Sequence, residues 1–311
     1  MKQAIEKQME INKSNNLLYR LAPELFRIDH SFKKELLTRI ERKENVSENV
    51  IHDTVNSLLK KIYKINQYIN IDNDGAMQLQ NLYRKTYNSL TSNNFDLVMK
   101  IHYERLSDII SCYYPEEIVK VLRNKKEIGS VKNEEYTFRI QQSLYEIEIE
   151  EIQEPVIDVG CGMSAAFVNH LLKENIDIVG IDRIIGNENE RIIQADWLTY
   201  DFKSQKWGMV YSNMAFTNHL HYHMHNGDCA KLNQYIEKYL EILESLKLFG
   251  ELIYAPSVLA LEENINTENF EVTRKRKIGD ISITKIKRIA ISSNWSSHGY
   301  CHDSCLRKNT R

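Results

Sequence analysis

The sequence predicts an α/β fold, with a helical first half followed by a parallel sheet and its crossover helices. Two observations predict it. Only Gly75 and Gly129 come before residue 150, whereas the other nine of the 11 glycines follow it, and glycine marks the tight turns between strands and helices. In addition, short apolar runs alternate with amphipathic segments after residue 150, which is typical of parallel strands joined by helices.

Amphipathic segments of helical length occupy most of the first half. In the clearest of them, Val55, Leu58 and Ile62 recur at helical spacing after Asp53, a candidate N-cap. The segments predicted to be helical are 1–22, 31–43, 53–69, 93–115 and 115–124. We therefore expect a helical N-terminal domain over residues 1–150, which caps the second domain or forms a homodimer interface.

Five apolar runs in the second half fit buried parallel strands. These runs are 155–160, 176–182, 191–196, 207–213 and 249–257, with helices predicted at 164–175 and 229–248. Gly279-Asp280 then separates two β-branched runs, which predicts an antiparallel hairpin. Residues 145–152 fit either a strand or a helix. The second domain should cover residues 151–292, followed by a polar tail at 293–311.

The segment DVGCGMSAAF, residues 158–167, has the strongest functional signal. It leaves the first strand and opens a helix, where Gly160 and Gly162 let a ligand approach the backbone and the helix start offers unpaired N–H groups. With Ala165, these glycines also fit the dinucleotide pattern G-x-G-x-x-A. Asp158 argues against that interpretation, because its carboxylate would repel a diphosphate and could instead bind a cationic ligand.

Two further carboxylates end the next two strands. Asp182 follows Gly162 by twenty residues, at a position where a carboxylate can accept both hydroxyls of a ribose. Asp196 precedes Trp197, and the pair offers an acceptor for an adenine amino group beside a flat apolar wall. The sequence therefore predicts a nucleoside site at the carboxyl edge of the sheet.

Residues 153–290 resemble the class I S-adenosylmethionine-dependent methyltransferases through the motifs DVGCG, GID and ADW. That family has a Rossmann-like seven-stranded sheet whose last strand is antiparallel, in agreement with the predicted hairpin. Ser164 departs from the family pattern, since many members have a third glycine there. The resemblance covers under half of the chain, and it implies S-adenosyl-L-methionine as the cofactor.

The resemblance also implies roles for individual residues. Asp158 and the two glycines after it would cradle the methionine moiety of the cofactor, and Asp182 would bind its ribose. Asp196 and Trp197 would bind its adenine. The other expected cofactor contacts lie beside these residues or at the end of the fourth strand: Cys161, Arg183, Ser212 and Asn213.

Histidines occupy every second position in NHLHYHMHNGD, after the fourth strand: His219, His221, His223 and His225. This segment should lie at the carboxyl edge of the sheet, where open α/β sheets bind ligands. His219 and His221 are nearest to the strand and are our candidate catalytic residues, because imidazole can take a proton near neutral pH. A solvated or packing role is one alternative. A metal clamp by i, i+4 pairs on a helix is another, although we predict no metal.

Composition and charge argue against several classes of function. The chain has 311 residues and a formal net charge of −2, so no overall basic field favours nucleic acid or an anionic membrane. The apolar runs are too short to span a bilayer, the first residues lack the pattern of a secretory signal, and the five cysteines are scattered. We therefore expect a cytoplasmic protein with reduced thiols.

Two other clusters give weaker signals. His298, Cys301, His302 and Cys305 form two H-x-x-C motifs that could bind zinc, but their polar surroundings favour a disordered tail. Basic residues crowd the predicted hairpin and could contact RNA, although alternation would put half of them on a solvated edge. These are Arg274, Lys275, Arg276, Lys277, Lys285, Lys287 and Arg288.

The function predicted from these features is transfer of a methyl group from S-adenosylmethionine to an oxygen or nitrogen atom of a small-molecule acceptor. The residues SNMAF after the fourth strand lack the Asp/Asn-Pro-Pro-aromatic motif of the family's nucleobase amino-methyltransferases. Two alternatives stay open. One is aminocarboxypropyl transfer from the same cofactor, and the other is a binding module that keeps the pocket without catalysis.

Overall fold

The computed structural model divides the chain into two compact units, Met1–Asn133 and Glu134–Arg311. It describes residues 2–12, 15–42, 44, 46–66, 68–91, 93–114, 116–127, 137–186, 188–226, 229–276 and 282–291. The H-x-x-C motifs and the turn at Gly279-Asp280 lie outside these residues. The second unit begins before residue 150 because α8 (Phe138–Tyr145) packs on the sheet domain, with the Phe138 ring stacked on His170 at 3.6 Å between centroids.

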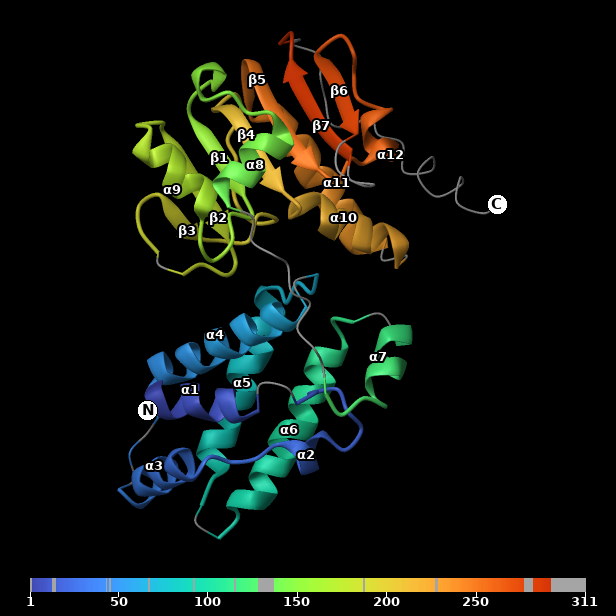
Figure 1. Ribbon diagram of the computed structural model, residues 1–311. Coiled ribbons are helices and arrows are strands. Elements are labelled where there is room, and N and C mark those ends of the chain that lie inside the picture. The colour runs from blue at the N-terminus through green and yellow to red at the C-terminus, as the bar shows by residue number, and fades with distance from the viewer. Residues whose placement is uncertain are drawn as a thin grey trace. The chain divides into compact units, whose positions relative to one another are not determined.

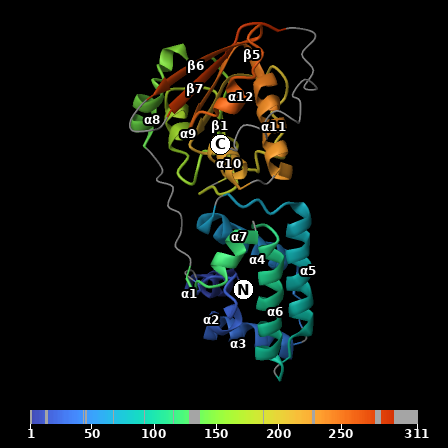
Figure 2. The ribbon, with the colours of Figure 1, turned by 90° about the vertical axis from the view of Figure 1, so that its right-hand side faces the viewer.

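The first unit is an array of helices (Figures 1 and 2). α4 (Glu48–Ile65) contacts α1 (Lys2–Ile11) and α5 (Asn73–Ser89), and α5 in turn contacts α6 (Phe95–Ser111). The shorter or peripheral helices are α2 (Ala22–Leu25), α3 (His30–Glu41) and α7 (Glu116–Leu122). Apolar faces at helical spacing meet in the core, where Leu79 of α5 is completely buried.

Two of these helices differ from the sequence-based expectation. α4 begins at Glu48, after Ser47, so Asp53 lies inside the helix and is not its N-cap. The sequence does not predict α5, because Gly75 and its polar neighbours resemble a turn. Asp72 caps α5 by accepting the Gly75 N–H at 3.0 Å, and a Cβ at Gly75 would lie 2.1 Å from the Tyr113 hydroxyl oxygen. Close packing against a neighbouring ring therefore requires this glycine.

His102 of α6 is a buried polar residue of this unit, only 3% exposed. The Thr86 hydroxyl donates its proton to the Leu82 carbonyl at 2.8 Å. His102 Nδ1, 2.8 Å from the same hydroxyl oxygen, must therefore be the donor to it, which puts the imidazole proton on Nδ1. Burial lowers the pKa of His102 from 6.5 to about 4, so the ring is neutral at pH 7.

This shift predicts that the helical unit is destabilised by mild acid. Unfolding restores the ordinary pKa of His102, so the unfolded state binds more protons than the folded state between about pH 6.5 and 4. We expect the free energy of unfolding of this unit to fall as the pH falls from 6.5 to 5, by at most about 1.4 kcal/mol per pH unit. Hydrogen exchange of the α6 amides, followed from pH 6.5 to 5, measures this free energy of unfolding.

The carboxylates with lowered pKa values in this unit, Asp29, Glu35 and Glu48, have ordinary pKa values of 3.8 to 4.5 and lose their stabilising interactions only below that range. His102→Asn keeps a donor for Thr86 but cannot titrate. It should therefore flatten the slope between pH 6.5 and 5, and an unchanged slope would contradict the assignment.

The second unit is built on a seven-stranded sheet in the order β3-β2-β1-β4-β5-β7-β6. β1 to β5 run parallel, and β7 runs antiparallel to both β5 and β6. This arrangement confirms the predicted Rossmann-like methyltransferase sheet. Its strands are β1 (Val156–Val159), β2 (Ile178–Asp182), β3 (Ile192–Gln194), β4 (Trp207–Asn213), β5 (Leu246–Ala255), β6 (Phe270–Arg276) and β7 (Ser282–Arg288).

Helices cover both faces of this sheet (Figures 1 and 2). α8 and α9 (Ala166–Lys173) bury Tyr211 on one face. α10 (Phe216–His225) and α11 (Cys229–Glu244) bury Trp207 on the other face. The short α12 (Leu259–Glu262) follows β5.

The structure decides one open segment of this unit and corrects one boundary. Residues 145–152, which fit either a strand or a helix by sequence, form the end of α8 and a short 3-10 helix, η1 (Ile149–Glu151). The predicted helix 229–248 is too long, because α11 ends at Glu244 and β5 starts at Leu246 and continues through Gly250. A strand that follows a helix without an intervening turn leaves no glycine or proline signal at the boundary.

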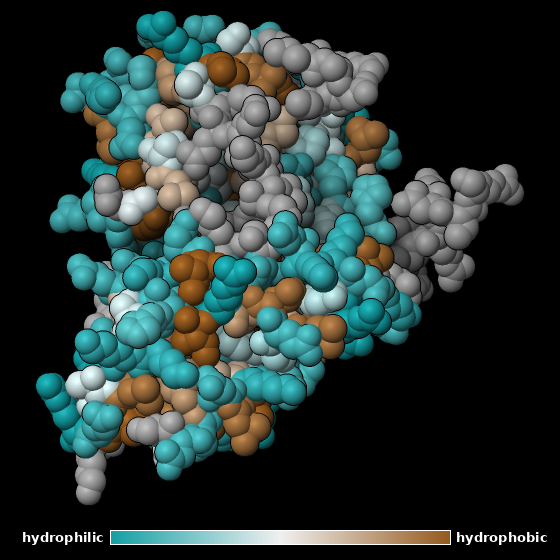
Figure 3. Space-filling model, turned by 60° about the horizontal axis from the view of Figure 1, so that its bottom comes forward, coloured by the Kyte–Doolittle hydropathy of each residue, from teal (hydrophilic) through white to brown (hydrophobic). Residues whose placement is uncertain are grey.

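The described residues expose both hydrophobic and charged side chains. None of the described helices is long and apolar enough to cross a membrane. On the face in Figure 3, hydrophobic residues form separate patches among hydrophilic ones. In the basic hairpin, Arg274 pairs with Glu262 and Lys275 with Glu146, so acidic neighbours neutralise part of its charge.

Candidate functional site

The carboxyl ends of β1, β2 and β3 adjoin, because β2 pairs in parallel with both of its neighbours. Asp158 lies opposite Gly180 of β2 in this register, and Asp182 is the last residue of β2. The Ala195 N–H donates to the Asp182 carbonyl at 3.0 Å, which fixes the chain just before Asp196. All three carboxylates predicted from the sequence therefore belong to one edge of the sheet.

Asp158 has the most unusual environment at this edge. It is 3% exposed, and its Oδ1 has no hydrogen-bond partner among the residues that the structure describes. Burial raises the pKa of Asp158 well above its ordinary value of 3.8, and the neighbouring Asp182 charge raises it further. A buried acceptor without a partner calls for a donor from a ligand or an ordered water.

The loop after β1 depends on its glycines in two ways. Gly160 has φ +87° and Gly162 has φ +72°, both in the left-handed region that favours glycine. A Cβ on Gly160 would lie 2.3 Å from the Cβ of Ala215 and 3.3 Å from the Trp197 ring. The space beside Gly160 is thus filled by the protein itself, so this glycine lets the loop and the start of α10 come together.

Asp182 holds the same loop in place. Its Oδ2 accepts the Gly162 N–H at 3.0 Å, and its Oδ1 accepts the Ile184 N–H at 2.8 Å. Burial raises the pKa of Asp182 above 3.8, while these amides and Arg183 oppose the shift. Each carboxylate oxygen has two lone pairs, and the Gly162, Ile184 and Arg183 amides use three of them, so Asp182 keeps the capacity to accept a hydroxyl group of a ligand.

Asp196 and Trp197 differ in their surroundings. Asp196 is half-buried and accepts the Leu198 N–H at 2.9 Å. Trp197 is only 3% exposed, with the His219 ring edge-on at 4.9 Å and the Arg183 guanidinium 5.5 Å from its ring. Its indole therefore lies within the core of the unit, where it supports Arg183 and His219, and most of its surface is covered by protein.

The residues at the end of β4 tie the site to its neighbours. The Ser212 hydroxyl donates to the Val159 carbonyl at 2.9 Å and accepts the Phe216 N–H at 3.2 Å, which joins β1, β4 and α10. Asn213 accepts the Tyr145 hydroxyl at 2.8 Å through its Oδ1. Cys161 has a buried thiol in the core beside α9, and its Sγ lies 3.8 Å from the Gly162 carbonyl oxygen.

α8 contributes polar side chains that the sequence does not predict. The Tyr211 hydroxyl donates to Gln141 Oε1 at 2.9 Å, and Tyr211 lies opposite Asp158 in the register between β1 and β4. Together with Tyr145, these groups put a buried polar cluster on the α8 side of the sheet. No motif marks them, because α8 precedes the first strand and its residues are ordinary for an amphipathic helix.

The four histidines of the run lie in α10, and their side chains have different surroundings. His219 is 1% exposed, its Nδ1 lies 2.9 Å from the Tyr235 hydroxyl, and burial lowers its pKa well below 6.5, with Arg183 acting in the same direction. His223 is also buried and stacks on Tyr235 at 5.2 Å between ring centroids. Both rings therefore lie in the interior between α10 and α11.

His221 lies beside the carboxyl end of β5. It is half-buried, and its Nε2 is 2.9 Å from the carbonyl oxygen of Ser257, which follows β5. Nε2 must therefore carry the proton, which leaves the lone pair on Nδ1. His225 is exposed and its Nδ1 contacts the His221 carbonyl at 2.7 Å. In the described part of the chain, no group of three or more His, Cys, Asp or Glu residues is placed to hold a metal.

No family model matches the chain, and no curated protein matches its sequence. Among solved structures, the N-methyltransferase NodS from Bradyrhizobium japonicum WM9 aligns at 12% identity over 49% of this chain and 97% of that chain, with a TM-score of 0.33. A SAM-dependent methyltransferase from Methanosarcina mazei aligns at 11% identity over 46% and 97%, with a TM-score of 0.31. The [4+2]-cyclase SpnF aligns at 15% identity over 38% and 44%, with a TM-score of 0.28.

The chain thus resembles the class I S-adenosylmethionine-dependent methyltransferases, through its strand order and through DVGCG, GID and ADW at the ends of β1, β2 and β3.

Proposed function

We propose that the second unit binds S-adenosylmethionine at the carboxyl edge of β1–β3 and transfers its methyl group to an oxygen or nitrogen atom of a small-molecule acceptor. The observation that carries this proposal is that the carboxylates of Asp158 and Asp182 lie close together at the carboxyl edge of neighbouring strands. Asp158 has a buried oxygen without a partner among the described residues, and Asp182 accepts the Gly162 N–H and so positions the glycine loop beside it.

The charge of these residues fits a cationic nucleoside better than a dinucleotide. Two electrostatically coupled carboxylates at the loop would repel a diphosphate, whereas an ammonium or sulfonium nearby would favour their ionised forms. Asp182 would bind a ribose hydroxyl and Asp196 the adenine amino group. When bound, the cofactor supplies a methyl group on a positively charged sulfur.

His221 is the better placed of the two candidate bases, because His219 is buried in the core. Nδ1 of His221 has the lone pair that a general base needs. We expect His221→Ala to lower turnover about 10²- to 10⁴-fold with unchanged cofactor affinity, measured as S-adenosylhomocysteine release with small phenols, alcohols and amines as acceptors. His225→Ala, on the exposed side of α10, is the control. Equal turnover in both variants would assign proton removal elsewhere.

Calorimetry with S-adenosylhomocysteine tests the function itself. The full-length protein should bind it with a dissociation constant in the micromolar range, as expected of about 8 kcal/mol of binding free energy. Absence of binding would exclude both methyl transfer and the alternative reaction, aminocarboxypropyl transfer. Product mass then distinguishes these two reactions, because they transfer different groups from the same sulfur.

A further inference from the structure

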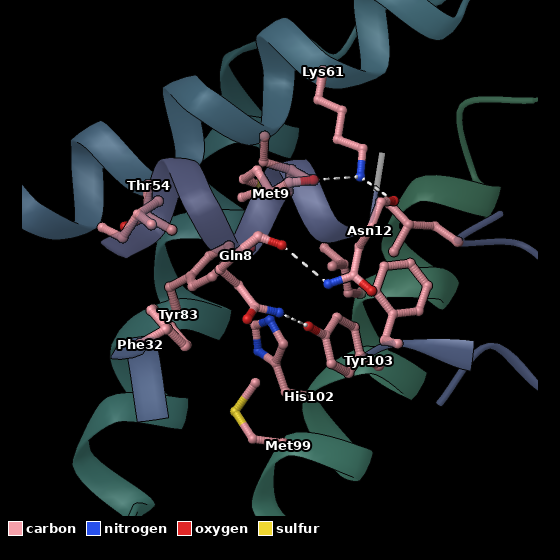
Figure 4. A pocket seen from close by; sticks show the side chains of 15 residues that line it. Gln8, Met9, Asn12, Phe32, Thr54, Lys61, Tyr83, Met99, His102 and Tyr103 are labelled. Atoms are coloured by element: carbon pink, nitrogen blue, oxygen red, sulfur yellow. Dashed lines mark hydrogen bonds between the residues drawn. The ribbon is translucent and has the colours of Figure 1, made fainter. Parts of the chain in front are cut away.

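The helical unit contains a partly open cavity that the proposed methyl transfer does not use (Figure 4). Its lining residues come from the helical unit alone, and most of them are apolar. The rings of Phe26 and Tyr103 stack at 4.5 Å between centroids, and Met9 and Met99 add flexible thioethers. Such walls fit a flat apolar ligand.

One polar atom beside this cavity has no partner among the residues that the structure describes. His102 donates through Nδ1 to Thr86, and His102 lines the cavity whereas Thr86 does not, so we infer that the opposite edge of the ring faces the cavity. The proton on Nδ1 leaves Nε2 with a lone pair, and His102 accepts no hydrogen bond from any residue that the structure describes. A neutral acceptor on a buried ring, only 3% exposed, thus faces a cavity with mostly apolar walls.

A hydroxyl donor lies beside this acceptor. Tyr103 contacts the His102 ring at 5.5 Å between centroids, and both residues lie on the same side of the cavity (Figure 4). The Tyr103 oxygen accepts the Gln8 amide at 3.3 Å, which leaves its own proton available. Gln8 is held in turn by the Arg27 carbonyl at 2.9 Å and the Asp29 N–H at 2.7 Å. An acceptor and a donor side by side are what a single hydroxyl group needs.

Lys61, a cationic side chain that lines the cavity, already has hydrogen-bond acceptors. Lys61 donates to the Met9 carbonyl at 3.4 Å and to the Asn12 carbonyl at 2.6 Å (Figure 4). Burial lowers the pKa of Lys61 from 10.5 to about 8, so its ammonium group is still mostly protonated at pH 7 and is held by these two carbonyls. These contacts favour a neutral ligand over an anionic one.

We propose that this cavity binds a small neutral aromatic alcohol of the phenol class. The aromatic ring packs among Phe26, Met9 and Met99, and the hydroxyl donates to His102 Nε2 and accepts from the Tyr103 hydroxyl. This site is independent of the cofactor site in the second unit.

Phenol and toluene form the matched pair of probes, because they share a shape and differ in the hydroxyl. Calorimetry on the full-length protein should give a dissociation constant for phenol below about 1 mM, and binding of toluene at least about tenfold weaker, because toluene leaves two buried polar groups without partners. Equal affinities, or no phenol binding at 1 mM, would overturn the proposal.

Two variants localise the probe. His102→Asn keeps the donor to Thr86 but loses the acceptor, and Tyr103→Phe loses only the hydroxyl. Each should weaken phenol about tenfold and leave toluene unchanged, whereas His52→Ala at the exposed face of α4 should change neither. Unchanged phenol affinity in both cavity variants would overturn the site. If the variants do not fold, the ¹⁵N resonance of His102 Nε2 in the wild type decides, because phenol must shift it.

Discussion

Replacing Asp182 by alanine should weaken S-adenosylhomocysteine binding by about 100-fold or more. Hydrogen bonds to a charged group contribute roughly 1.5–3 kcal/mol each, and the carboxylate can still accept a ribose hydroxyl beside the backbone amides that it binds. The same substitution releases the Gly162 and Ile184 amides, so the loop that shapes the site loses its attachment to β2. Calorimetry of wild type and variant at neutral pH measures the loss.

Asp177→Ala is the matched control for this experiment. Asp177 immediately precedes the same strand, at its other end, where its side chain is 51% exposed and pairs with Arg191 on the surface. Its loss should leave the affinity within about twofold, because exposed ion pairs contribute little. Asp182→Asn then separates charge from shape, since one oxygen remains to accept an amide. An affinity equal to wild type in Asp182→Ala would contradict the assignment of the ribose site.

The sheet and its carboxylates could be predicted because their signals are local. A buried parallel strand is a short apolar run, and the residue that ends it falls at the carboxyl edge whatever the rest of the chain does. Asp158, Asp182 and Asp196 therefore follow from the sequence alone. The hairpin β6–β7 follows in the same way from β-branched runs around a turn.

The remaining features depend on packing between distant segments. The spacing of the histidine run fits one face of a strand or two i, i+4 pairs on a helix. His219 and His223 are buried because they contact Tyr235 of α11, which is distant in the sequence. Tyr145 reaches Asn213 across 68 positions, which no pattern within α8 indicates. Gly75 resembles a turn residue until Tyr113 packs against it.

The loop after β1 should tolerate a methyl group at Gly160 very poorly. Gly160→Ala combines strain at φ +87° with a Cβ only 2.3 Å from that of Ala215. Left-handed backbone costs a non-glycine residue roughly 1–2 kcal/mol, and overpacking costs about 1–3 kcal/mol more. We expect the second unit to lose about 2–5 kcal/mol of unfolding free energy, measured by denaturant unfolding, and the affinity for S-adenosylhomocysteine to fall because the loop is displaced.

A second substitution separates the clash from the strain. Ala215→Gly removes the methyl group that the new Cβ would meet, and by itself it should cost only about 1 kcal/mol. In the double variant the clash disappears while the backbone strain remains. Its unfolding free energy should therefore be about 1–3 kcal/mol higher than the value expected if the losses of the two single variants were additive. Recovery of S-adenosylhomocysteine binding in the same variant would show that the contact between the loop and α10 shapes the cofactor site. Strictly additive losses would mean that Gly160 acts through its backbone conformation alone.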